Sequence, residues 1–574
     1  MIRDDLIQLI QKAIKKAQHK GDLPKFDPPP VTVTRPKEGT YGDYACPVCM
    51  SMGRLARMAP LAIAERVVAN LDQHAAVGSV QVAPPGFINI TLSPAWVAQQ
   101  VETIVREGER FGHVDVPGPG SGGRRVQVEY ISANPTGPLT IGAARNAVIG
   151  DTLANVLAAA GWQVQREYYV NDIGTQMELF AASLYARYAQ ALGQAEPLPE
   201  EGYPGSYLVD MGREVAQEYG DRFLRMERKA ALEALRAEGL RRMLDSIRAD
   251  AEALGVHFDA WQSEQALYDE GTYATVFNQL SSQGWLVERD GAVWFRSDRE
   301  AADRTPQGNE QANKTLEDKD NVVVRSDGRP TYFASDIAYV WDKLVRRGFD
   351  WAIYVWGADH QGHVPRMKAV TRALGLDPER VTFILYQLVT LKRGGQLVRM
   401  GKRTGEIITL REVIEEIGAD ATRFMLLTRS ADSQMELDLT LAAQQSSENP
   451  VYYVQYGHAR IASIFRYARE RGVDAEGGDV SLLTHPAEQA LIRHMLRLPE
   501  TVAQCAETVS PHHLTHYAQE LAAAFHSFYK ECRVVSDDPA HAELARARLK
   551  LVWAAKIVLA NTLRLIGVSA PESM

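Results

Sequence analysis

Hydrophobic positions repeat with helical spacing at the start of the chain and with strand spacing further on. From Leu6 to Ile14 an apolar residue recurs at every fourth position, which is typical of an amphipathic helix. Charged residues interrupt this apolar run and argue against a signal peptide. A short apolar strand is predicted at residues 86–92, and a Pro- and Gly-rich linker at residues 113–125. These patterns predict an α+β domain over residues 1–112.

A strand, a helix and a second strand are predicted directly after the linker. Residues 126–131 are rich in β-branched side chains, and residues 162–170 form a second such run. Between them, apolar side chains from Ile149 to Ala160 share one helical stripe, which Gly161 ends. A strand–helix–strand order predicts a parallel sheet, in which ligands bind beyond the carboxyl ends of the strands.

The strand pattern resumes at residues 351–360 and 381–389, after a long charged and helical stretch. We therefore expect one α/β domain over residues 126–440, with a helical insertion at about residues 175–320. From residue 441 to residue 574 the pattern is helical, which predicts an all-α domain.

The totals fit a protein of several globular domains. A chain of 574 residues is expected to form about three domains, and 45% hydrophobic against 24% charged residues supplies ordinary cores. The formal net charge of −9 argues against a fold built around one basic face, although a local basic patch would still bind nucleic acid. No apolar run is long enough to cross a membrane, so we expect a cytoplasmic protein with no membrane partner.

The four cysteines are too few for a disulfide framework. Cys46 and Cys49 form a C-x-x-C pair, but no further ligands lie nearby at zinc spacing. We expect both to be small packing residues, and the sequence predicts no metal site.

Two stretches suit a phosphate group. The turn at residues 134–142 places Pro and Gly just before a helix, where free backbone N–H groups and the helix dipole favour an anion. The loop at residues 396–410 carries Lys402 and Arg403 between glycines, which suits a triphosphate. A plain tight turn and a solvated loop are the alternatives, and neither stretch excludes its alternative alone.

Two further stretches carry polar residues in suggestive patterns. In "GADHQGH" (residues 357–363), His360 and His363 lack a third metal ligand, so nucleotide or substrate contacts, or packing, are favoured over a metal. Tyr332 and Asp336 lie four residues apart on one predicted helical face. A buried Asp beside a pocket would select a guanidinium or an ammonium, while two unrelated polar residues are the alternative.

Several stretches, in order along nearly the whole chain, resemble one family. They are "VEYISANPTGPL", "YYVNDIGTQ", "LGVHFDAWQSE", "GADHQGH", "MGKRTG", "ENPVYYVQYGHAR", "FHSFYKECRVV" and "GVSAPESM". Together they resemble bacterial arginyl-tRNA synthetases. The resemblance implies a class I Rossmann-type catalytic domain, an N-terminal domain that binds the tRNA elbow and a C-terminal domain that binds the anticodon.

The resemblance also implies the reaction and its partners. ATP, used as its Mg²⁺ complex, and arginine would form arginyl-adenylate, and the arginyl group would pass to an arginine-accepting tRNA. Activation in this family usually requires the tRNA. We expect a monomer with no tightly bound cofactor.

Site residues follow from the resemblance, position by position. The arginine pocket is expected to comprise Glu129, Asn134, Tyr332, Asp336 and Gln361. ATP is expected to contact Ala133, Asn134, Pro135, Thr136, Gly137, Pro138, Leu139, Thr140, Ile141, Gly142, Ala143, Asp359, His360, His363, Met400, Gly401 and Lys402. Catalytic roles are expected for Thr140, Gly142, Lys402 and Arg403, and tRNA contacts for Tyr452, Tyr456, His458 and Arg460.

Two signatures depart from the family pattern. The family's H-I-G-H is Thr140-Ile141-Gly142-Ala143 here, so both imidazoles are missing, and its K-M-S-K-R becomes residues 399–403, "RMGKR". We expect an active enzyme in which the Thr140 hydroxyl is the surviving donor. The alternatives are a paralogue that binds tRNA and arginine without activating arginine, and a synthetase for another amino acid such as lysine.

Overall fold

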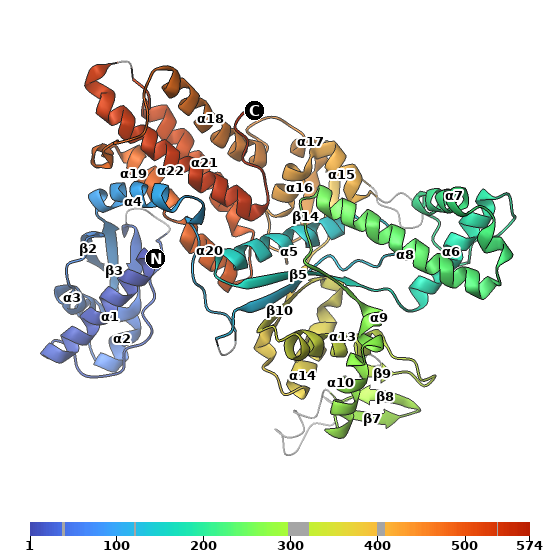
Figure 1. The fold of residues 1–574 in the computed structure, drawn as a ribbon. Coiled ribbons are helices and arrows are strands. Elements are labelled where there is room, and N and C mark those ends of the chain that lie inside the picture. The colour runs from blue at the N-terminus through green and yellow to red at the C-terminus, as the bar shows by residue number, and fades with distance from the viewer. Residues whose placement is uncertain (37–40, 120–121, 297–320, 399–407, 537) are drawn as a thin grey trace.

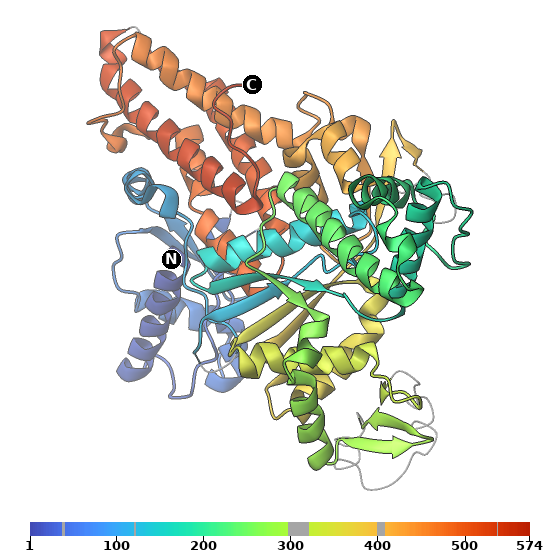
Figure 2. The same cartoon turned by 45° about the vertical axis from the view of Figure 1, so that its right-hand side comes forward.

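The computed structural model describes residues 1–36, 41–119, 122–296, 321–398, 408–536 and 538–574. Its parts are arranged as a central parallel sheet with an N-terminal domain at one side and a bundle of C-terminal helices above it (Figures 1 and 2). The predicted fold class is confirmed: an α/β catalytic domain lies between an α+β domain and an all-α domain.

The N-terminal domain packs helices on a small antiparallel sheet of strand order β1-β3-β2. Its elements are α1 (Ile2–Lys20), β1 (Tyr44–Cys46), α2 (Val48–Ala56), α3 (Pro60–Ala69), β2 (Val77–Ala83) and β3 (Phe87–Leu92). Helix α4 (Pro94–Glu107) follows and begins at Ser93, whose side chain accepts a hydrogen bond from the Trp96 N–H. Leu6, Ile10 and Ile14 on α1 are fully buried, as their spacing predicted.

The central sheet has five strands in the order β11-β10-β4-β5-β6, and every neighbouring pair is parallel. The strands are β4 (Arg125–Glu129), β5 (Gln163–Val170), β6 (Ala260–Ser263), β10 (Trp351–Gly357) and β11 (Val381–Tyr386). Helix α5 (Ile141–Ala159) connects β4 to β5. The predicted strand–helix–strand unit is therefore present, and all the carboxyl ends of the strands point to one edge.

Alternate residues of β10 face two separate hydrophobic cores. Ile353 and Val355 pack into the larger core, which includes α5 and the C-terminal helices. Ala352 and Tyr354 pack on the opposite face, against α13 (Tyr332–Trp341) and α14 (Val364–Ala373). Because side chains alternate along a strand, one central strand fixes the helices on both faces relative to its carboxyl end.

The segment between β5 and β10 is less uniformly helical than predicted. Helices α6 (Thr175–Ala191), α7 (Ser206–Tyr219) and α8 (Arg228–Ala253) fit the expected insertion. After residue 260 the helical prediction holds for two helices and is wrong where β6 joins the central sheet and where three further strands follow those helices. The other elements here are α9 (Glu264–Asp269), α10 (Thr272–Ser282), β7 (Leu286–Arg289), β8 (Ala292–Phe295) and β9 (Val322–Val324).

A hairpin, three short helices and a strand lead from the sheet to the C-terminal helices. The predicted "RGGQ" turn joins β12 (Val389–Arg393) to β13 (Gln396–Leu397), and both of its glycines have positive φ. The elements that follow are α15 (Leu410–Ile417), α16 (Ala419–Leu426), β14 (Met435–Asp438) and α17 (Leu439–Ala442). The C-terminal helices are α18 (Pro450–Glu470), α19 (Pro486–Met495), α20 (Leu498–Glu507), α21 (His513–Glu531) and α22 (Ala542–Ile566).

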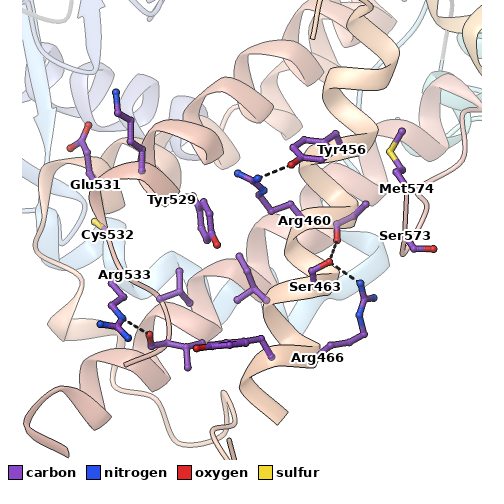
Figure 3. A pocket seen from close by; sticks show the side chains of 16 residues that line it. Tyr456, Arg460, Ser463, Arg466, Tyr529, Glu531, Cys532, Arg533, Ser573 and Met574 are labelled. Atoms are coloured by element: carbon purple, nitrogen blue, oxygen red, sulfur yellow. Dashed lines mark hydrogen bonds between the residues drawn. The ribbon is translucent and has the colours of Figure 1, made fainter. Parts of the chain in front are cut away.

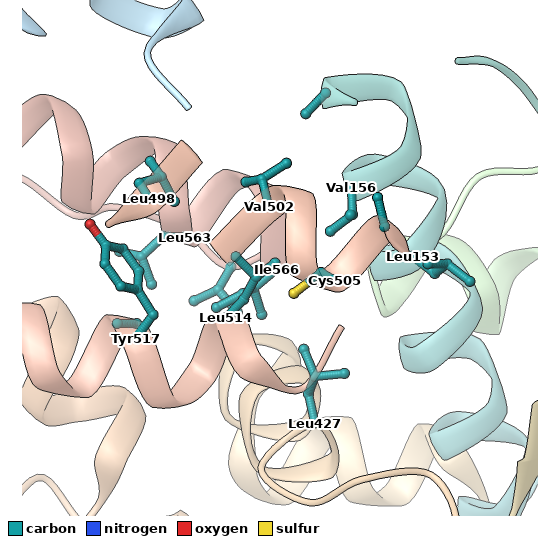
Figure 4. Close-up of a cluster of buried hydrophobic side chains, with 14 of the residues drawn as sticks. Leu153, Val156, Leu427, Leu498, Val502, Cys505, Leu514, Tyr517, Leu563 and Ile566 are labelled. Atoms are coloured by element: carbon teal, nitrogen blue, oxygen red, sulfur yellow. The ribbon is translucent and has the colours of Figure 1, made fainter. Parts of the chain in front are cut away.

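The catalytic and C-terminal domains share one apolar core. Leu153 and Val156 of α5 face Val502 and Cys505 of α20, and Ile566 at the end of α22 closes the same cluster (Figure 4). These side chains are almost completely buried. Apolar burial of this extent makes the contact a continuous interior rather than a mobile domain boundary.

One buried guanidinium joins the middle of α5 to the ends of α22 and α8. Arg423 on α16 is 1% exposed and donates to Asp151 of α5. It also donates to the carbonyl oxygen of Ile566 at 3.0 Å and to that of Leu254, directly after α8, at 3.2 Å. A buried cation needs such partners, so the positions of these three helices relative to α16 are closely specified.

The N-terminal domain is held against the C-terminal helices by ion pairs. Arg35 forms a two-bond contact with Glu500 on α20, at 2.9 and 3.0 Å. Arg493 on α19 donates to Asp43 at 2.9 Å.

Over the described ranges, no helix combines the length and the apolar character needed to cross a lipid bilayer.

Candidate functional site

The candidate site lies where the central strands end, around the turn that connects β4 to α5. Ile131 and Ser132 have φ values of 65° and 42°, which non-glycine residues adopt at a cost. Asn146 on α5 holds this turn, since its Oδ1 accepts from the Ile131 N–H at 2.6 Å and its Nδ2 donates to the Val355 carbonyl at 2.8 Å. The buried side-chain amide of Asn146 therefore fixes the conformation of the turn.

Side chains from neighbouring elements fix the rest of the turn. Tyr168 donates to the Ala133 carbonyl at 2.7 Å, and Tyr207 of α7 donates to the Thr136 carbonyl at 2.6 Å. Asn171, just after β5, donates to Asn134 Oδ1 at 3.1 Å. The turn predicted to bind an anion is thus held by the second strand and the insertion.

Thr140 and Gly142 lie at the N-terminus of α5. Thr140 is the N-cap residue, yet its hydroxyl makes no capping hydrogen bond. A Cβ added at Gly142 would meet only Thr140 Oγ1, at 3.7 Å, so packing within the protein does not require glycine there. The helix start therefore offers a hydroxyl and first-turn N–H groups beside open space, which suits an anion.

The second predicted phosphate-binding stretch, residues 396–410, contacts this turn through its last residues. Thr140 and Thr409 form an isolated antiparallel bridge, and the Leu410 N–H donates to the Leu139 carbonyl at 2.7 Å. Met400, Gly401, Lys402 and Arg403 lie outside the described residues. The structure nonetheless shows that residues 408–410, which directly follow that loop, are attached to the start of α5.

The two residues predicted on one helical face lie at the start of α13. Tyr332 is half exposed, and Asp336 is one turn further along. Asp336 Oδ2 lies 2.8 Å from Nε2 of His363, so the structure links two of the predicted site residues. The His363 ring also contacts Phe333 edge-on, at 5.6 Å between centroids. The arrangement leaves Asp336 partly exposed with its second oxygen available.

Acidic groups converge on Tyr169, the penultimate residue of β5. Its hydroxyl is buried without a partner among the described residues. Its pKa is raised well above the ordinary value, first by burial and then by Glu264, Asp336 and Glu129. Three carboxyl groups on three elements therefore surround one point of the sheet edge, which makes this region suited to a cation.

Glu264, the first residue of α9, is the member of this group with an unpaired carboxyl oxygen. It is 2% exposed; its Oε1 accepts from the Ser335 hydroxyl at 2.5 Å, and its Oε2 is buried with no partner in the described part of the chain. Burial, together with Asp336 and Asp172, raises the pKa of its carboxyl to about 7. An orphaned buried carboxyl oxygen beside an acidic pocket is a candidate for binding a ligand donor.

Glu129, at the end of β4, is paired with a buried lysine. Its Oε2 lies 2.6 Å from Nζ of Lys343, a residue that is fully buried. In the sheet its register partners are Tyr354 of β10 and Glu167 of β5. Burial raises the pKa of Glu129 and lowers that of Lys343, while the attraction between the two groups opposes both shifts.

The remaining predicted residues lie on a short 3-10 helix, η6 (Ala358–His363), after β10. Asp359, His360 and Gln361 are all exposed there, on the same edge of the sheet as Glu129. The Trp356 ring lies beside His360 and His363, at 5.8 and 5.6 Å between centroids. Exposed polar groups next to an aromatic face fit the predicted nucleotide or substrate contacts better than a packing role.

Metal-ligand clusters were sought in the described part of the chain, and no group of three His, Cys, Asp or Glu there could hold an ion. Cys46 and Cys49 are buried and free, and burial raises their thiol pKa values to about 11 and about 12. Thiols that remain protonated pack as small apolar groups, as predicted for this pair.

A second candidate surface lies on the C-terminal helices. A cavity of about 870 Å³ opens between α18, α21 and the segment after α21 (Figure 3). Tyr456 and Arg460 point into it from α18, and the Arg460 guanidinium lies over the rings of Tyr456 and Tyr529 at 4.9 and 5.2 Å. Tyr452 stacks on Tyr456, with 6.1 Å between ring centroids. Accessible aromatic faces with cations are the features that bind unstacked bases.

His458 does not belong to this surface. It is 2% exposed, and its Nδ1 lies 2.8 Å from the carbonyl oxygen of Pro571. Burial lowers the pKa of the imidazole. The predicted tRNA contact of His458 is therefore corrected to a packing role, because its helical face is covered by the C-terminal segment.

A third hollow, of about 320 Å³, lies between the N-terminal domain and α19. It is lined by Tyr41, Gln81, Asn89, Thr91 and Arg493, among others. Tyr41 is 51% exposed, and Asn89 is 7% exposed. An exposed aromatic ring beside a buried amide suits a flipped-out base.

The sequence reasoning did not find Lys343, Glu264 or the role of Tyr169. A weak signal existed for Lys343, since it follows Asp336 and Tyr339 at helical spacing on one face. Glu264 belongs to a stretch that the family resemblance included, but no property of its neighbours marks it as buried.

Comparison with known proteins covers nearly the whole chain. A family model described as the tRNA synthetases class I (R) catalytic domain matches residues 119–462. A model of the arginyl tRNA synthetase N terminal domain matches residues 4–92, and one of the DALR anticodon binding domain matches residues 454–574.

Individual relatives agree with these models. An arginine–tRNA ligase of Dehalococcoides mccartyi is 49% identical over 575 residues, covering 100% of this chain and 99% of the relative. An arginine–tRNA ligase of Heliobacterium modesticaldum is 47% identical, with the same coverage. The solved arginyl-tRNA synthetase of Thermus thermophilus has a TM-score of 0.74 at 23% identity over 100% of both chains, which shows a shared fold.

Proposed function

Because the chain belongs to the class I arginyl-tRNA synthetases and attaches arginine to tRNA at the expense of ATP, we propose that its reaction takes place at the carboxyl edge of the central sheet. The expected alternatives, an inactive paralogue and a lysine enzyme, find no support in relatives named arginine–tRNA ligase. The acidic groups near Tyr169, with the unpaired Glu264 Oε2 among them, are the observation that carries the placement.

ATP binds at the start of α5. The turn of residues 133–143 and the free hydroxyl of Thr140 face the phosphates, which enter as the Mg²⁺ complex. The helix dipole and the first-turn N–H groups stabilise the charge that shifts when adenylate forms. Thr409, which follows Lys402 and Arg403 in the sequence, is bridged to Thr140, and this supports assigning those two cations to the same phosphates.

Arginine binds between the ends of β4, β5 and α13. The guanidinium presents five donors in a plane and needs carboxylates in matching positions. Asp336 and the orphaned Oε2 of Glu264 supply these, while Tyr332 at the helix start closes the pocket. Glu129 and Asn134, at the end of β4 and in the turn, contact the same substrate, and Gln361 approaches from η6. A lysine ammonium would leave several of these acceptors unpaired, which is costly when they are buried.

tRNA binds across the molecule. The cavity lined by Tyr456 and Arg460 takes anticodon bases, and the hollow at Tyr41 and Asn89 takes a base of the elbow. The Arg35–Glu500 contact keeps the two surfaces at a fixed separation. We assign residues 1–112 to elbow binding, 126–440 to catalysis and 441–574 to the anticodon.

A single chain contains all three substrate surfaces, so the protein acts as a monomer. Its four cysteines are all free and buried, which fits the reducing cytoplasm where tRNA is charged.

The test is arginine-dependent exchange of pyrophosphate into ATP, measured with and without arginine-accepting tRNA. We expect exchange with arginine and tRNA, and none with lysine in place of arginine. Glu264→Gln should raise the arginine KM while leaving the ATP KM unchanged, since Gln cannot offer the second carboxylate oxygen. An unchanged arginine KM for both Glu264→Gln and Asp336→Asn would refute the placement of the pocket.

A further inference from the structure

Lys343 is a buried cation next to the proposed arginine pocket, and none of the roles assigned above uses it. It is 0% exposed and lies on η5 (Asp342–Arg346), a π-helical turn directly after α13. π-Helical turns are rare and are often found at functional sites. Helix α13 carries Tyr332 and Asp336, so Lys343 and two pocket residues belong to one continuous element.

The ammonium of Lys343 is held by an aromatic cage and one carboxylate. Its Nζ lies 3.8 Å from the ring centroid of Tyr339 and 3.5 Å from that of Tyr354. The same Nζ lies 2.6 Å from Glu129 Oε2. The other nearby acid, Glu167, already accepts from Arg347 and from the Tyr339 hydroxyl. Glu129 is thus the carboxylate with which Lys343 forms a direct ion pair.

Among the described residues, only one oxygen of Glu129 has a partner. No described residue donates to Oε1, and the side chain keeps 6% of its surface exposed. Glu129 ends β4 at the sheet edge where the pocket lies. Its free oxygen is therefore available to a ligand, while its bound oxygen faces the lysine.

We propose that Lys343 is a positioning residue for arginine binding: it takes one oxygen of Glu129, keeps that carboxylate ionised, and leaves the other oxygen for a cationic group of the substrate. The proposal rests on the proposed function, in which Glu129 contacts arginine. Lys343 itself touches neither substrate nor reacting atoms.

The charged surroundings explain why Glu129 needs this partner. The groups that face Glu129 are Lys343 on η5, Glu167 on β5 and Asp336 on α13. Lys343 is the cation among them, and Arg347 is already committed to Glu167. Lys343 lowers the pKa of Glu129, whereas burial and the two neighbouring acids raise it, so losing Lys343 shifts Glu129 towards the protonated form, which attracts a cation less.

The test compares Lys343→Met, which is apolar and similar in length, with the parent in pyrophosphate exchange with tRNA and ATP saturating. We expect the ratio of the variant's arginine KM to the parent's to be about tenfold or more near pH 6.5, and to fall to about threefold or less near pH 9, because rising pH favours the ionised form of Glu129 even without Lys343. The ATP KM and kcat should change by less than about threefold. Lys343→Arg should restore much of the affinity. Lys368→Met, which removes a surface lysine paired with Glu379, is the matched control and should match the parent.

A KM ratio that is the same at both pH values would overturn the proposal, since lost packing does not titrate. If Lys343→Met does not fold, Glu129→Gln and the double variant Glu129→Gln/Lys343→Met replace it: equal arginine KM values support the proposal, and a further rise in the double variant overturns it. If Glu129→Gln itself leaves the arginine KM unchanged, it is the proposed site that fails. If Glu129→Gln raises KM and Lys343→Met does not, only the role of Lys343 fails.

Discussion

Replacing Thr140 by Val removes a single hydroxyl from the start of α5. The Thr140 side chain makes no capping hydrogen bond, and its backbone, at φ −101° and ψ 172°, is extended and suits a β-branched residue. The bridge to Thr409 uses backbone groups that Val retains. We therefore expect the free energy of unfolding to change by no more than about 0.5 kcal/mol.

The expected effect on catalysis is larger. One donor to a developing negative charge is worth about 2.7–4 kcal/mol in a fully enclosed site, or about 10²–10³ in rate. Thr140 is half-buried and would share its task with the first-turn N–H groups of α5, so we expect a loss of about half the lower value or more. A loss of about 1.4 kcal/mol corresponds to a tenfold slower adenylate formation.

Pyrophosphate exchange in the presence of tRNA measures this step. We expect Thr140→Val to lower kcat by about tenfold or more, with the KM values for arginine and ATP within about twofold of the parent's, because the hydroxyl acts in the transition state. Thr140→Ser keeps the hydroxyl and should exchange at close to the parent rate. Parental exchange by Thr140→Val would show that the hydroxyl has no catalytic role, and an equal loss in Thr140→Ser would assign the effect to the missing methyl group.

Three further outcomes are expected. Asp336→Ala should raise the arginine KM by about 10² or more with an unchanged melting profile, because a charged, forked partner of the guanidinium is lost; a near-parental KM would refute the assignment. Tyr456→Ala should raise the tRNA KM by about tenfold, as expected for one lost base stack. His458→Ala should instead lower the melting temperature more than it affects tRNA binding. A larger effect of His458→Ala than of Tyr456→Ala on the tRNA KM would contradict the burial of His458. Glu264 has a pKa of about 7 in the folded state, above its unfolded value, so its ionisation lowers the free energy of unfolding as pH rises from about 4.5 through 7. By differential scanning fluorimetry, Glu264→Gln should therefore melt at a higher temperature than the parent near pH 8 and at the same temperature near pH 5. If the difference in melting temperature between variant and parent were equal at both pH values, the charge of Glu264 would not be its cause.

Much of the catalytic fold could be predicted from the sequence, because local patterns and tertiary packing agree there. Strand β10 is a continuous apolar run, as a strand covered on both faces is expected to be, and β4 and β5 carry β-branched and aromatic residues between their polar ones. Strand β6 was missed because its four residues, "AWQS", are all half-buried and show no alternation. Its place in the sheet is decided by pairing with β5, a contact 90 or so residues away in sequence.

Site residues that belong to a recognisable motif could be predicted from the sequence, and those whose role depends on burial could not. Tyr332, Asp336 and Thr140 occupy the predicted edge because they follow recognisable elements. Lys343 contradicts the rule that charged residues stay outside, so no pattern marks it as part of the interior. His458 was misplaced for the opposite reason: helical spacing assigns a face, but only the returning C-terminal segment shows that this face is covered.

The contact network of Arg423 bears on how such proteins can recombine. An exchange that replaced everything after residue 440 would import a foreign α22 but keep the native Arg423, Asp151 and Leu254. The incoming helix would have to end where α22 ends, at Ile566. Otherwise the buried guanidinium of Arg423 would lose the carbonyl oxygen of Ile566 as an acceptor. Working hybrids should therefore be rare unless α16 is exchanged together with the C-terminal helices.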